Sequence, residues 1–184
     1  KNNKMRKELY KKIEIPAGVE AEIEGTRVKI KGPEGENIRK FNTGSLELIK
    51  EGNIISLGSK NSTKKEKKMM NTIAAHIKNM ILGVQEKFEY ELKAVFSHFP
   101  ITIEVKGHEV IIKNFLGEKI PRKTIIPKGV EIEVNGNLIK IRSIDRELAG
   151  QAAANLETVT LIKNRDRRVF QDGIFMIKKP GREI

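Results

Sequence analysis

The sequence predicts an α+β fold of two tandem duplicated domains, each a mostly antiparallel sheet covered by a helix. Three observations lead to this prediction. A seventeen-residue stretch occurs twice, at 15–31 and 126–142, with nine identical positions, and such a repeat marks a duplicated unit. Both halves contain short runs of alternating apolar and polar residues divided by glycine turns, which is typical of antiparallel strands. Each half also contains one stretch with the period of an amphipathic helix.

The first domain is expected to span residues 1–86 and to begin with strands. Alternation predicts a meander over 11–31, broken by turns at 16–18 and 25–26. A glycine-containing turn at 32–35 follows it. The remaining strands are expected at 38–41, 46–49 and 54–57. Together these strands predict a sheet with one face still open.

A helix is predicted from Lys64 to Val84, where apolar residues recur on one helical face. Thr63 and Glu66 have the spacing of a capping box. Gly83 is expected to mark the far end of the helix. This helix would cover the open face of the first sheet.

The second domain is expected to span residues 87–184. Strands are predicted at 88–96, 101–105, 110–113 and across the repeated meander 123–142, whose tight turn is Asn135-Gly136-Asn137. Ser143 is expected to cap a second helix. The apolar side of that helix consists of Leu148, Ala149, Ala152, Ala153 and Leu156. The tail from 163 to 184 is predicted to be basic and irregular, with a short apolar piece at 174–177.

The charge balance favours a polyanionic partner. The 184 residues include 36 Lys and Arg against 24 Asp and Glu, a net charge of +12, which makes nucleic acid the leading expectation. The chain has no cysteine, which excludes disulfides, thiolate metal sites and cysteine nucleophiles and fits a cytosolic protein. It also lacks an apolar run long enough to span a bilayer, so no membrane partner is expected.

Three groups of cations are candidate RNA-binding residues. The tail supplies the densest group, in which arginine forks suit phosphate oxygens. A second group follows a strand end at Asn114-Phe115-Leu116-Gly117, and a third surrounds the start of the first helix, where free backbone amides could help to hold a phosphate. The cations at the start of the first helix could equally be a solvated run of charges. The tail could equally be a disordered, solvated segment. The candidates are Lys163, Asn164, Arg165, Arg167, Arg168, Lys178, Lys179 and Arg182; Lys113, Lys119 and Arg122; and Lys60, Lys64 and Lys65.

The aromatic residues are expected to lie in the core. Phe115 could stack on a base, but a phenylalanine at a strand end more often packs inside. The same interpretation applies to the other aromatic residues beside predicted strands, namely Phe41, Phe88, Tyr90, Phe96 and Phe99.

Signals for an enzyme are poor. No phosphate-binding GxxxxGK[ST] loop is present. The three histidines, His76, His98 and His108, have no metal-ligand spacing. Glu20, Glu22 and Glu24 share one strand face and are expected to point to solvent. The sequence therefore predicts no catalytic activity, cofactor, metal or small-molecule substrate, although an RNA-modifying or RNA-cleaving enzyme stays open as a minor alternative.

Several motifs, taken in order, resemble one known family. They are Ile15-Pro16-Ala17-Gly18-Val19, Gly32-Pro33-Glu34-Gly35, Ala94 to Ile101, Asn114 to Gly117, Gln151 to Asn155, and Asn164 to Arg168 with Phe170 to Ile174. Over nearly its whole length the chain resembles large-subunit ribosomal protein number six, on the archaeal and eukaryotic branch whose eukaryotic member is numbered nine. The bacterial branch has a Gly-Lys-Gly sequence in the tail, which this chain lacks.

The resemblance implies two α+β domains that bind large-subunit ribosomal RNA near the elongation-factor site and the stalk base. In the family the second domain and its tail make much of this contact, which falls on 163–168 and 178–182 here. It further implies a cytoplasmic, ribosome-bound protein without catalysis or cofactor. Its partners would be neighbouring ribosomal proteins near the stalk base and, indirectly, translation factors. The alternative is a general RNA or polyanion binder, such as an RNA chaperone or an adaptor.

Overall fold

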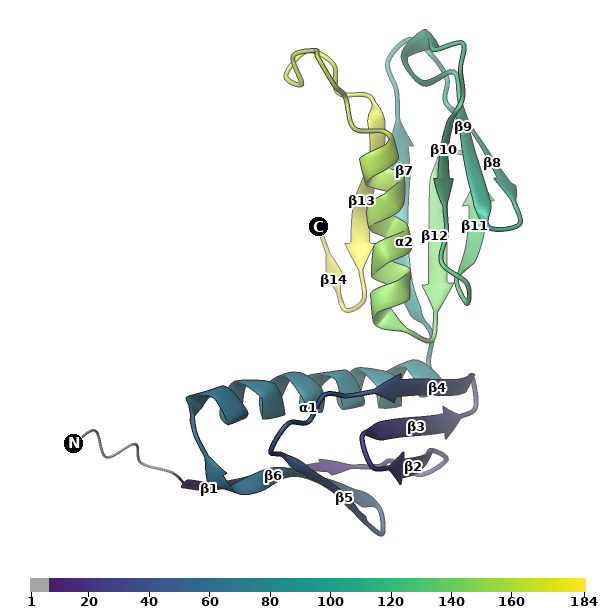
Figure 1. Ribbon diagram of the computed structural model, residues 1–184. Helices are drawn as coiled ribbons and strands as arrows, with labels where there is room; N and C mark the ends of the chain where they lie inside the picture. The colour runs from purple at the N-terminus through teal and green to yellow at the C-terminus, as the bar shows by residue number, and fades with distance from the viewer. Residues whose placement is uncertain (1–6) are drawn as a thin grey trace, which may run out of the picture. The chain divides into compact units, whose positions relative to one another are not determined.

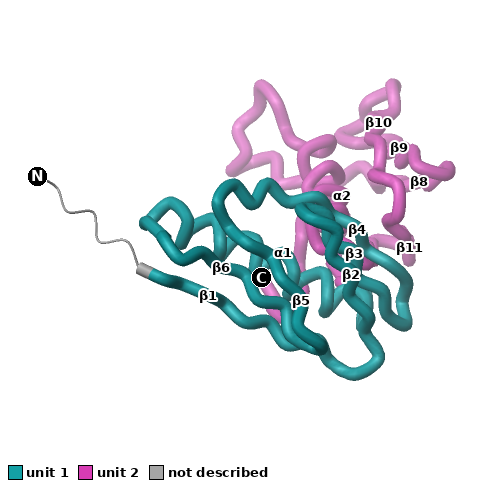
Figure 2. Tube along the Cα trace, turned by 60° about the horizontal axis from the view of Figure 1, so that its bottom comes forward, with its two compact units in different colours: residues 1–87 teal, residues 88–184 magenta. Residues whose placement is uncertain are grey.

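The computed structural model describes residues 7–184 (Figure 1). The chain divides into two compact units, Lys1–Lys87 and Phe88–Ile184 (Figure 2), one residue later than the division expected at 86/87. Within residues 7–184, each unit has antiparallel sheets and one α-helix. The predicted α+β class with two duplicated domains is confirmed, but each unit contains two sheets where a single one was expected.

Unit 1 builds two three-stranded antiparallel sheets, ordered β1-β6-β5 and β2-β3-β4, and one helix, α1, packs against both. Alternate residues of the strands point inward, so Val28, Ile30, Ile55 and Leu57 are fully buried, as is Ile77 of the helix that packs on β3 and β6. The strands are β1 (Lys7–Glu14), β2 (Glu20–Glu24), β3 (Arg27–Gly32), β4 (Gly35–Lys40), β5 (Glu47–Glu51) and β6 (Ile54–Ser62), and α1 is Lys64–Gln85.

The predicted continuous meander over 11–31 is wrong. The strand β1 pairs with β6 rather than with β2, and residues 15–19 carry the chain from one sheet to the other. Pro16 has no N–H with which to continue a ladder, and Gly18 adopts a φ of 85°, a left-handed conformation that favours glycine. The two residues together end one sheet before the next begins.

The two ends of α1 differ from each other in how they are held. The predicted capping box is confirmed, because the Thr63 amide donates to Glu66 Oε2 (2.9 Å) and Thr63 Oγ1 accepts from the Lys65 amide (3.3 Å). The predicted stop at Gly83 is wrong: Gly83 lies buried inside the helix. The helix continues because the turn before β4 holds its last residues, where the Glu34 amide donates to the Val84 carbonyl (3.0 Å).

Unit 2 has a five-stranded sheet, ordered β11-β12-β7-β13-β14, and a three-stranded sheet, β10-β9-β8. The helix α2 packs across both, and its alanines Ala149, Ala152 and Ala153 are fully buried. The elements are β7 (Phe88–Val95), β8 (Thr102–Lys106), β9 (Glu109–Lys113), the 3-10 helix η1 (Phe115–Gly117), β10 (Arg122–Ile125), β11 (Glu131–Asn135), β12 (Leu138–Ser143), α2 (Arg146–Val159), β13 (Gly173–Lys179) and β14 (Arg182–Glu183).

Three predictions for unit 2 need correction. The second meander is also split, since β10 pairs with β9 and not with β11. Asp145 rather than Ser143 caps α2: its carboxylate accepts from the Glu147 amide at 2.8 Å, while Ser143 ends β12 and donates to the Gly129 carbonyl. The tail is not irregular throughout. Its apolar piece lies in β13, which pairs with β7 and buries Ile174.

The sequence repeat corresponds to a repeated hairpin. The strands β2 and β3 begin at residues 20 and 27, and β11 and β12 begin at 131 and 138, so both are displaced by 111 residues. The path after the hairpin differs. The strand β12 leads directly to α2, whereas β4, β5 and β6 separate β3 from α1.

Candidate nucleic-acid interface

Three loops meet at one end of unit 2 (Figure 1): residues 96–101, 114–121 and 160–172. We call them the loop end. Hydrogen bonds tie them together: Ser97 Oγ donates to Asp172 Oδ1 (3.0 Å), Asn114 Nδ2 donates to the Pro100 carbonyl (3.1 Å), and Arg122 Nη1 donates to the Leu161 carbonyl (3.2 Å). Segments far apart in sequence therefore form one cross-linked surface.

Arg122 links the segments of the loop end, and we call its set of contacts the Arg122 bracket. Its Nε and Nη2 donate to both Glu118 carboxylate oxygens (2.8 and 2.6 Å), and its Nη1 donates to the Val159 and Leu161 carbonyls. The guanidinium also lies 4.3 Å from the centre of the Phe115 ring, a favourable cation–π distance. These hydrogen bonds hold the pKa of Glu118 below its ordinary value. Because these donors are used inside the fold, Arg122 organises the surface.

The segment 163–171, here called the arginine loop, is exposed but locally ordered. The amides of Val169 and Phe170 donate to the Asp166 carbonyl (3.1 and 3.0 Å), and the Asp166 carboxylate accepts from the Arg168 amide (2.9 Å). The bond from the Arg168 amide and those from its side chain hold the pKa of Asp166 below its ordinary value. The Arg165 guanidinium lies 4.9 Å from the Phe170 ring centre. The turn around Asp166 thus presents its arginines outward.

Both ends of the arginine loop are anchored to the fold. On the α2 side, Thr160 is buried, and its Oγ1 accepts from the Ile174 amide at 3.0 Å. On the β13 side, the buried Asp172 accepts from both the amide and the hydroxyl of Ser97. The loop therefore leaves and re-enters unit 2 at fixed points, which lowers the entropy cost of binding a partner.

The candidate residues of the tail separate into two groups. Lys163, Asn164, Arg165, Arg167 and Arg168 all lie in the arginine loop and are exposed. Lys178, Lys179 and Arg182 lie toward the opposite end of unit 2, because β13 runs antiparallel to β7 and pairs Gly173 with Val95 but Lys178 with Glu91. Lys178 Nζ is also 3.2 Å from Glu91 Oε1 and 3.8 Å from Glu89 Oε1. The tail is therefore not one continuous basic patch.

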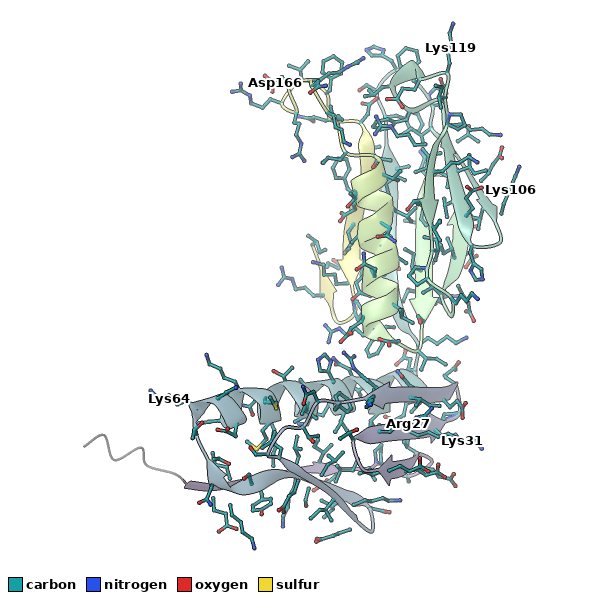
Figure 3. All side chains as sticks on the ribbon, viewed as in Figure 1. Arg27, Lys31, Lys64, Lys106, Lys119 and Asp166 are labelled. Carbon is teal, nitrogen blue, oxygen red and sulfur yellow. The ribbon has the colours of Figure 1, made fainter. Side chains whose placement is uncertain are left out.

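The strand-end candidates differ in their availability. Lys119 is exposed at the loop end, and Figure 3 shows it at the same end of unit 2 as Asp166, with Lys106 away from that end. Lys113 is also exposed but forms an ion pair with Glu104.

The candidates Lys60, Lys64 and Lys65 are exposed around the start of α1 in unit 1, where Figure 3 labels Lys64. The helix amides predicted to help with a phosphate are in part already used, because the capping box occupies the Lys65 amide. The hydrogen bonds from Thr63 lower the pKa of Glu66, so this carboxylate stays ionised beside the amides. Any anion here would be held mainly by lysine side chains.

The aromatic predictions are confirmed in part. Phe115 is buried (1% exposed), and Phe41, Phe88 and Tyr90 are also core residues. The prediction for Phe99 is wrong, because it is 46% exposed and lies over Gly117, whose φ is +74°. Sequence reasoning also missed three other exposed side chains of the loop end: His98, Ile120 and Val169. For Phe99, the available signals were its place beyond the predicted strand 88–96 and the proline directly after it.

Within residues 7–184, no group of three or more His, Asp or Glu side chains is placed to hold a metal ion. No helix there has the length and apolar character needed to cross a membrane. Glu20, Glu22 and Glu24 are exposed on β2, as predicted.

Comparison with known proteins decides the family. The sequence profile of the family described as Ribosomal protein L6 matches residues 15–87 and 99–173. The chain belongs to the ribosomal protein L6 family. One matched segment lies in unit 1 and the other in unit 2. The second segment of the L6 match includes the whole arginine loop and ends at Gly173, where β13 begins.

Three archaeal relatives match more than nine-tenths of this L6 chain, and each is described as large ribosomal subunit protein uL6. The protein of Methanobrevibacter smithii is 46% identical over 171 residues, covering 93% of this chain and 96% of the relative. That of Archaeoglobus fulgidus is 44% identical, with 94% and 92% covered. That of Methanothrix thermoacetophila is 43% identical, with 95% and 99% covered. The predicted resemblance is therefore confirmed.

Proposed function

We propose that this chain is a structural component of the large ribosomal subunit that binds large-subunit rRNA through the loop end of unit 2. Membership of the L6 family supports the ribosomal role. We place the contact near the elongation-factor site and the stalk base, as the resemblance implies. The partners are then rRNA, neighbouring ribosomal proteins and, indirectly, translation factors, on cytoplasmic ribosomes.

The arginine loop is the observation that carries the proposal. It contains Lys163, Arg165, Arg167 and Arg168 against the single acid Asp166, and the Arg168 side chain is 91% exposed. Arginine forks match the geometry of phosphate oxygens. Because the loop is anchored at both ends and folded around Asp166, these forks are presented on a defined surface.

The mechanism is that of a brace rather than a catalyst. Cations of the loop end neutralise phosphates, so affinity falls steeply as salt rises. Selectivity comes from the shape of the RNA that fits the three loops, since RNA helices are recognised mainly by shape and backbone. Bound in this way, the protein holds rRNA segments in position. We propose no reaction, cofactor or metal for it.

The test is a competition binding assay with the full chain at roughly physiological salt, where non-specific binding is weak. The competitors are the large-subunit rRNA region that holds the factor-binding loop and an unrelated structured RNA of equal length. Strong preference for the ribosomal fragment is expected. Equal competition would instead favour the alternative, a general RNA or polyanion binder.

A pair of double variants locates the contact. Arg167→Ala with Arg168→Ala removes two charges from the arginine loop, and Lys106→Ala with Lys128→Ala removes two exposed charges from elsewhere in unit 2. The arginine variant should lose roughly tenfold or more in rRNA affinity, and its salt slope should fall by about two. The lysine variant should bind nearly as the unmodified chain does. Equal effects would contradict the assignment to the loop end.

A further inference from the structure

A pocket of about 780 Å³ lies in unit 2 between the end of α2, the arginine loop and the start of β13. Its volume falls within the range of small-molecule binding sites, about 300–1,000 Å³. Arg167 and Arg168 line it, so the pocket opens beside the cations that the proposed function assigns to rRNA phosphates. The packing of α2 and β13 does not by itself account for this pocket.

One side of the pocket is apolar and incompletely covered. Val95, Leu161, Phe170 and Phe175 all line it, and they are 40%, 40%, 37% and 43% exposed. Ile174, beside them in the chain, is buried. Half-exposed apolar side chains gathered around one hollow, two of them aromatic, are typical of a binding site rather than of a solvated surface.

Two polar side chains of the pocket, those of Glu157 and Gln171, are held in place by hydrogen bonds to the backbone. Glu157 Oε1 accepts from the Met176 amide at 2.8 Å, and Gln171 Nε2 donates to the Arg168 carbonyl at 3.1 Å. Both side chains line the pocket. A carboxylate has room for several hydrogen bonds, so Glu157 can accept a further one from the N–H group of a ligand.

Phenyl rings, a carboxylate acceptor and an arginine rim together match one kind of ligand. A nucleobase has flat faces that stack on aromatic rings and edge N–H groups that donate to carboxylates, and in RNA its ribose is linked to a phosphate on each side. We infer that the pocket receives one unstacked, amino-bearing nucleobase of the bound RNA, with its flanking phosphates on Arg167 and Arg168. This inference rests on the proposed function and deepens it.

The pocket adds a means of selection that phosphate contacts lack. A base can enter only where the RNA has a bulge, a loop or an end, because bases in a helix are stacked and paired. The arginines would attract any RNA, whereas the pocket would favour RNA that presents an unpaired base at the right place. Adenine, cytosine and guanine carry an exocyclic amino group that can donate to Glu157, whereas uracil offers only a single ring N–H.

The first test is rRNA affinity of the full chain at several salt concentrations. Phe175→Ala should weaken binding roughly 5- to 150-fold, the loss expected for one stacked base, with an unchanged salt slope because no phosphate contact is removed. Phe175→Leu keeps an apolar side chain in β13 and should lose less. Val105→Ala removes an exposed apolar side chain from β8, outside the pocket, and should change nothing. Thermal unfolding of all three variants checks that they are folded.

The second test uses two hairpin RNAs that differ in a single group. One has a bulged adenosine, and the other has an abasic bulge with the same number of phosphates. The unmodified chain should prefer the hairpin with the adenosine, and Phe175→Ala should abolish the preference. A third hairpin with a bulged uridine should have an affinity between those of the adenosine and abasic hairpins. Equal affinity for both hairpins, or unchanged rRNA affinity of Phe175→Ala, would overturn the pocket assignment.

The outcomes separate the pocket from the function on which it rests. If the unmodified chain does not prefer large-subunit rRNA over an unrelated RNA, the proposed function fails. If it does, but is indifferent to the bulged base, the pocket inference alone fails. A third outcome is that Phe175→Ala binds RNA normally but, in a reconstituted large subunit, no longer retains a neighbouring ribosomal protein. In that case the pocket holds a peptide segment, and the nucleobase inference is wrong.

Discussion

Two groups of cations in this protein look alike in sequence and differ in structure. The lysine group of unit 1 surrounds the start of α1 and consists of Lys60, Lys64, Lys65, Lys67 and Lys68, with Glu66 among them. The arginine loop of unit 2 is an irregular segment that hydrogen bonds fold around Asp166. Four of the five lysines lie on a regular helix whose first amides are partly capped, and Lys60 lies in β6 just before it. The arginine loop has no regular structure, yet the bonds of its own backbone fix its shape.

The difference predicts that two groups of similar charge density would bind RNA in different ways. Lysine ammonium groups on flexible stems act as point charges, which attract any polyanion and are screened by salt. Arginine forks on an anchored loop also restrict the direction from which a phosphate can be bound. Steering is therefore the expected role of the lysine group, and positioning that of the arginine loop.

The largest expected effect comes from neutralising the two groups in parallel. Arg165, Arg167 and Arg168 replaced by Ala should weaken rRNA binding by about 100-fold and lower the salt slope by about three. Lys64, Lys65 and Lys68 replaced by Ala remove the same charge, and α1 should remain folded because Ala is the best helix former. This lysine variant should lose about tenfold or less in rRNA affinity. Filter binding across a salt series measures both variants.

This pair of variants can disprove the proposed difference between the lysine group and the arginine loop. Equal losses and equal salt slopes would show that the number of charges, and not their geometry, determines affinity. A circular dichroism spectrum of each variant serves as the control for folding.

The second effect separates two arginines within unit 2. Arg122→Ala removes four hydrogen bonds and a cation–π contact from a side chain that is 23% exposed. The free energy of unfolding should fall by roughly 1–3 kcal/mol, because hydrogen bonds from a charged group contribute strongly and the part-buried Val159 carbonyl loses its donor. Arg168→Ala, at a 91% exposed side chain, should change it by less than about 0.5 kcal/mol.

Denaturant titration of the two variants measures this contrast. Arg122→Lys tests the geometry, since an ammonium group cannot span the Glu118 carboxylate and two carbonyls in the same way. If Arg122→Ala were as stable as Arg168→Ala, Arg122 would belong with the RNA-binding cations after all.

The sequence predicted elements better than it predicted their assembly. Periodicity located α1 to within one residue at its C-terminal end, and the repeat located the two hairpins, because both signals are local. It failed where pairing is long-range. Nothing in residues 7–14 reveals that they pair with β6 instead of with the following strand, since that choice depends on how two sheets share one helix.

The candidate site shows the same limit. Composition found Arg165, Arg167 and Arg168, which the structure places on one loop. It also joined them to Lys178, Lys179 and Arg182, because closeness in sequence says nothing about strand direction. Once β13 forms, the two groups lie toward opposite ends of the sheet. The Arg122 bracket and the pocket under the arginine loop need contacts across more than thirty residues, and no local pattern predicts them.

A smaller effect tests whether the helix start in unit 1 can act as an anion site. Thr63→Ala removes the cap of α1 and should cost about 1 kcal/mol of stability. It also frees the Lys65 amide, which in the unmodified chain donates a hydrogen bond to Thr63 Oγ1. We expect rRNA affinity to stay constant, because lysine side chains and not amides make the attraction here. Thr72→Ala, an exposed position within α1, is the matched control for stability.

A rise in rRNA affinity of Thr63→Ala would contradict this expectation. It would show that the capping box competes with a phosphate for the same amides, and the lysine group would then resemble a positioning site.

The smallest effect concerns the pH dependence of the Arg122 bracket. The hydrogen bonds from Arg122 lower the pKa of Glu118 in the folded chain, whereas in the unfolded chain it returns to its ordinary value, about 4.3. The stabilisation is therefore fully present above that value and is lost as the pH falls through the lower, folded pKa. Glu118→Gln should be less stable than the unmodified chain at neutral pH, and the difference should shrink on acidification. Denaturant titrations between about pH 7 and pH 3 measure this. Because Glu118 is partly exposed, solvent screens the effect, but a constant difference at all pH values would show that the bracket acts by packing and not by charge.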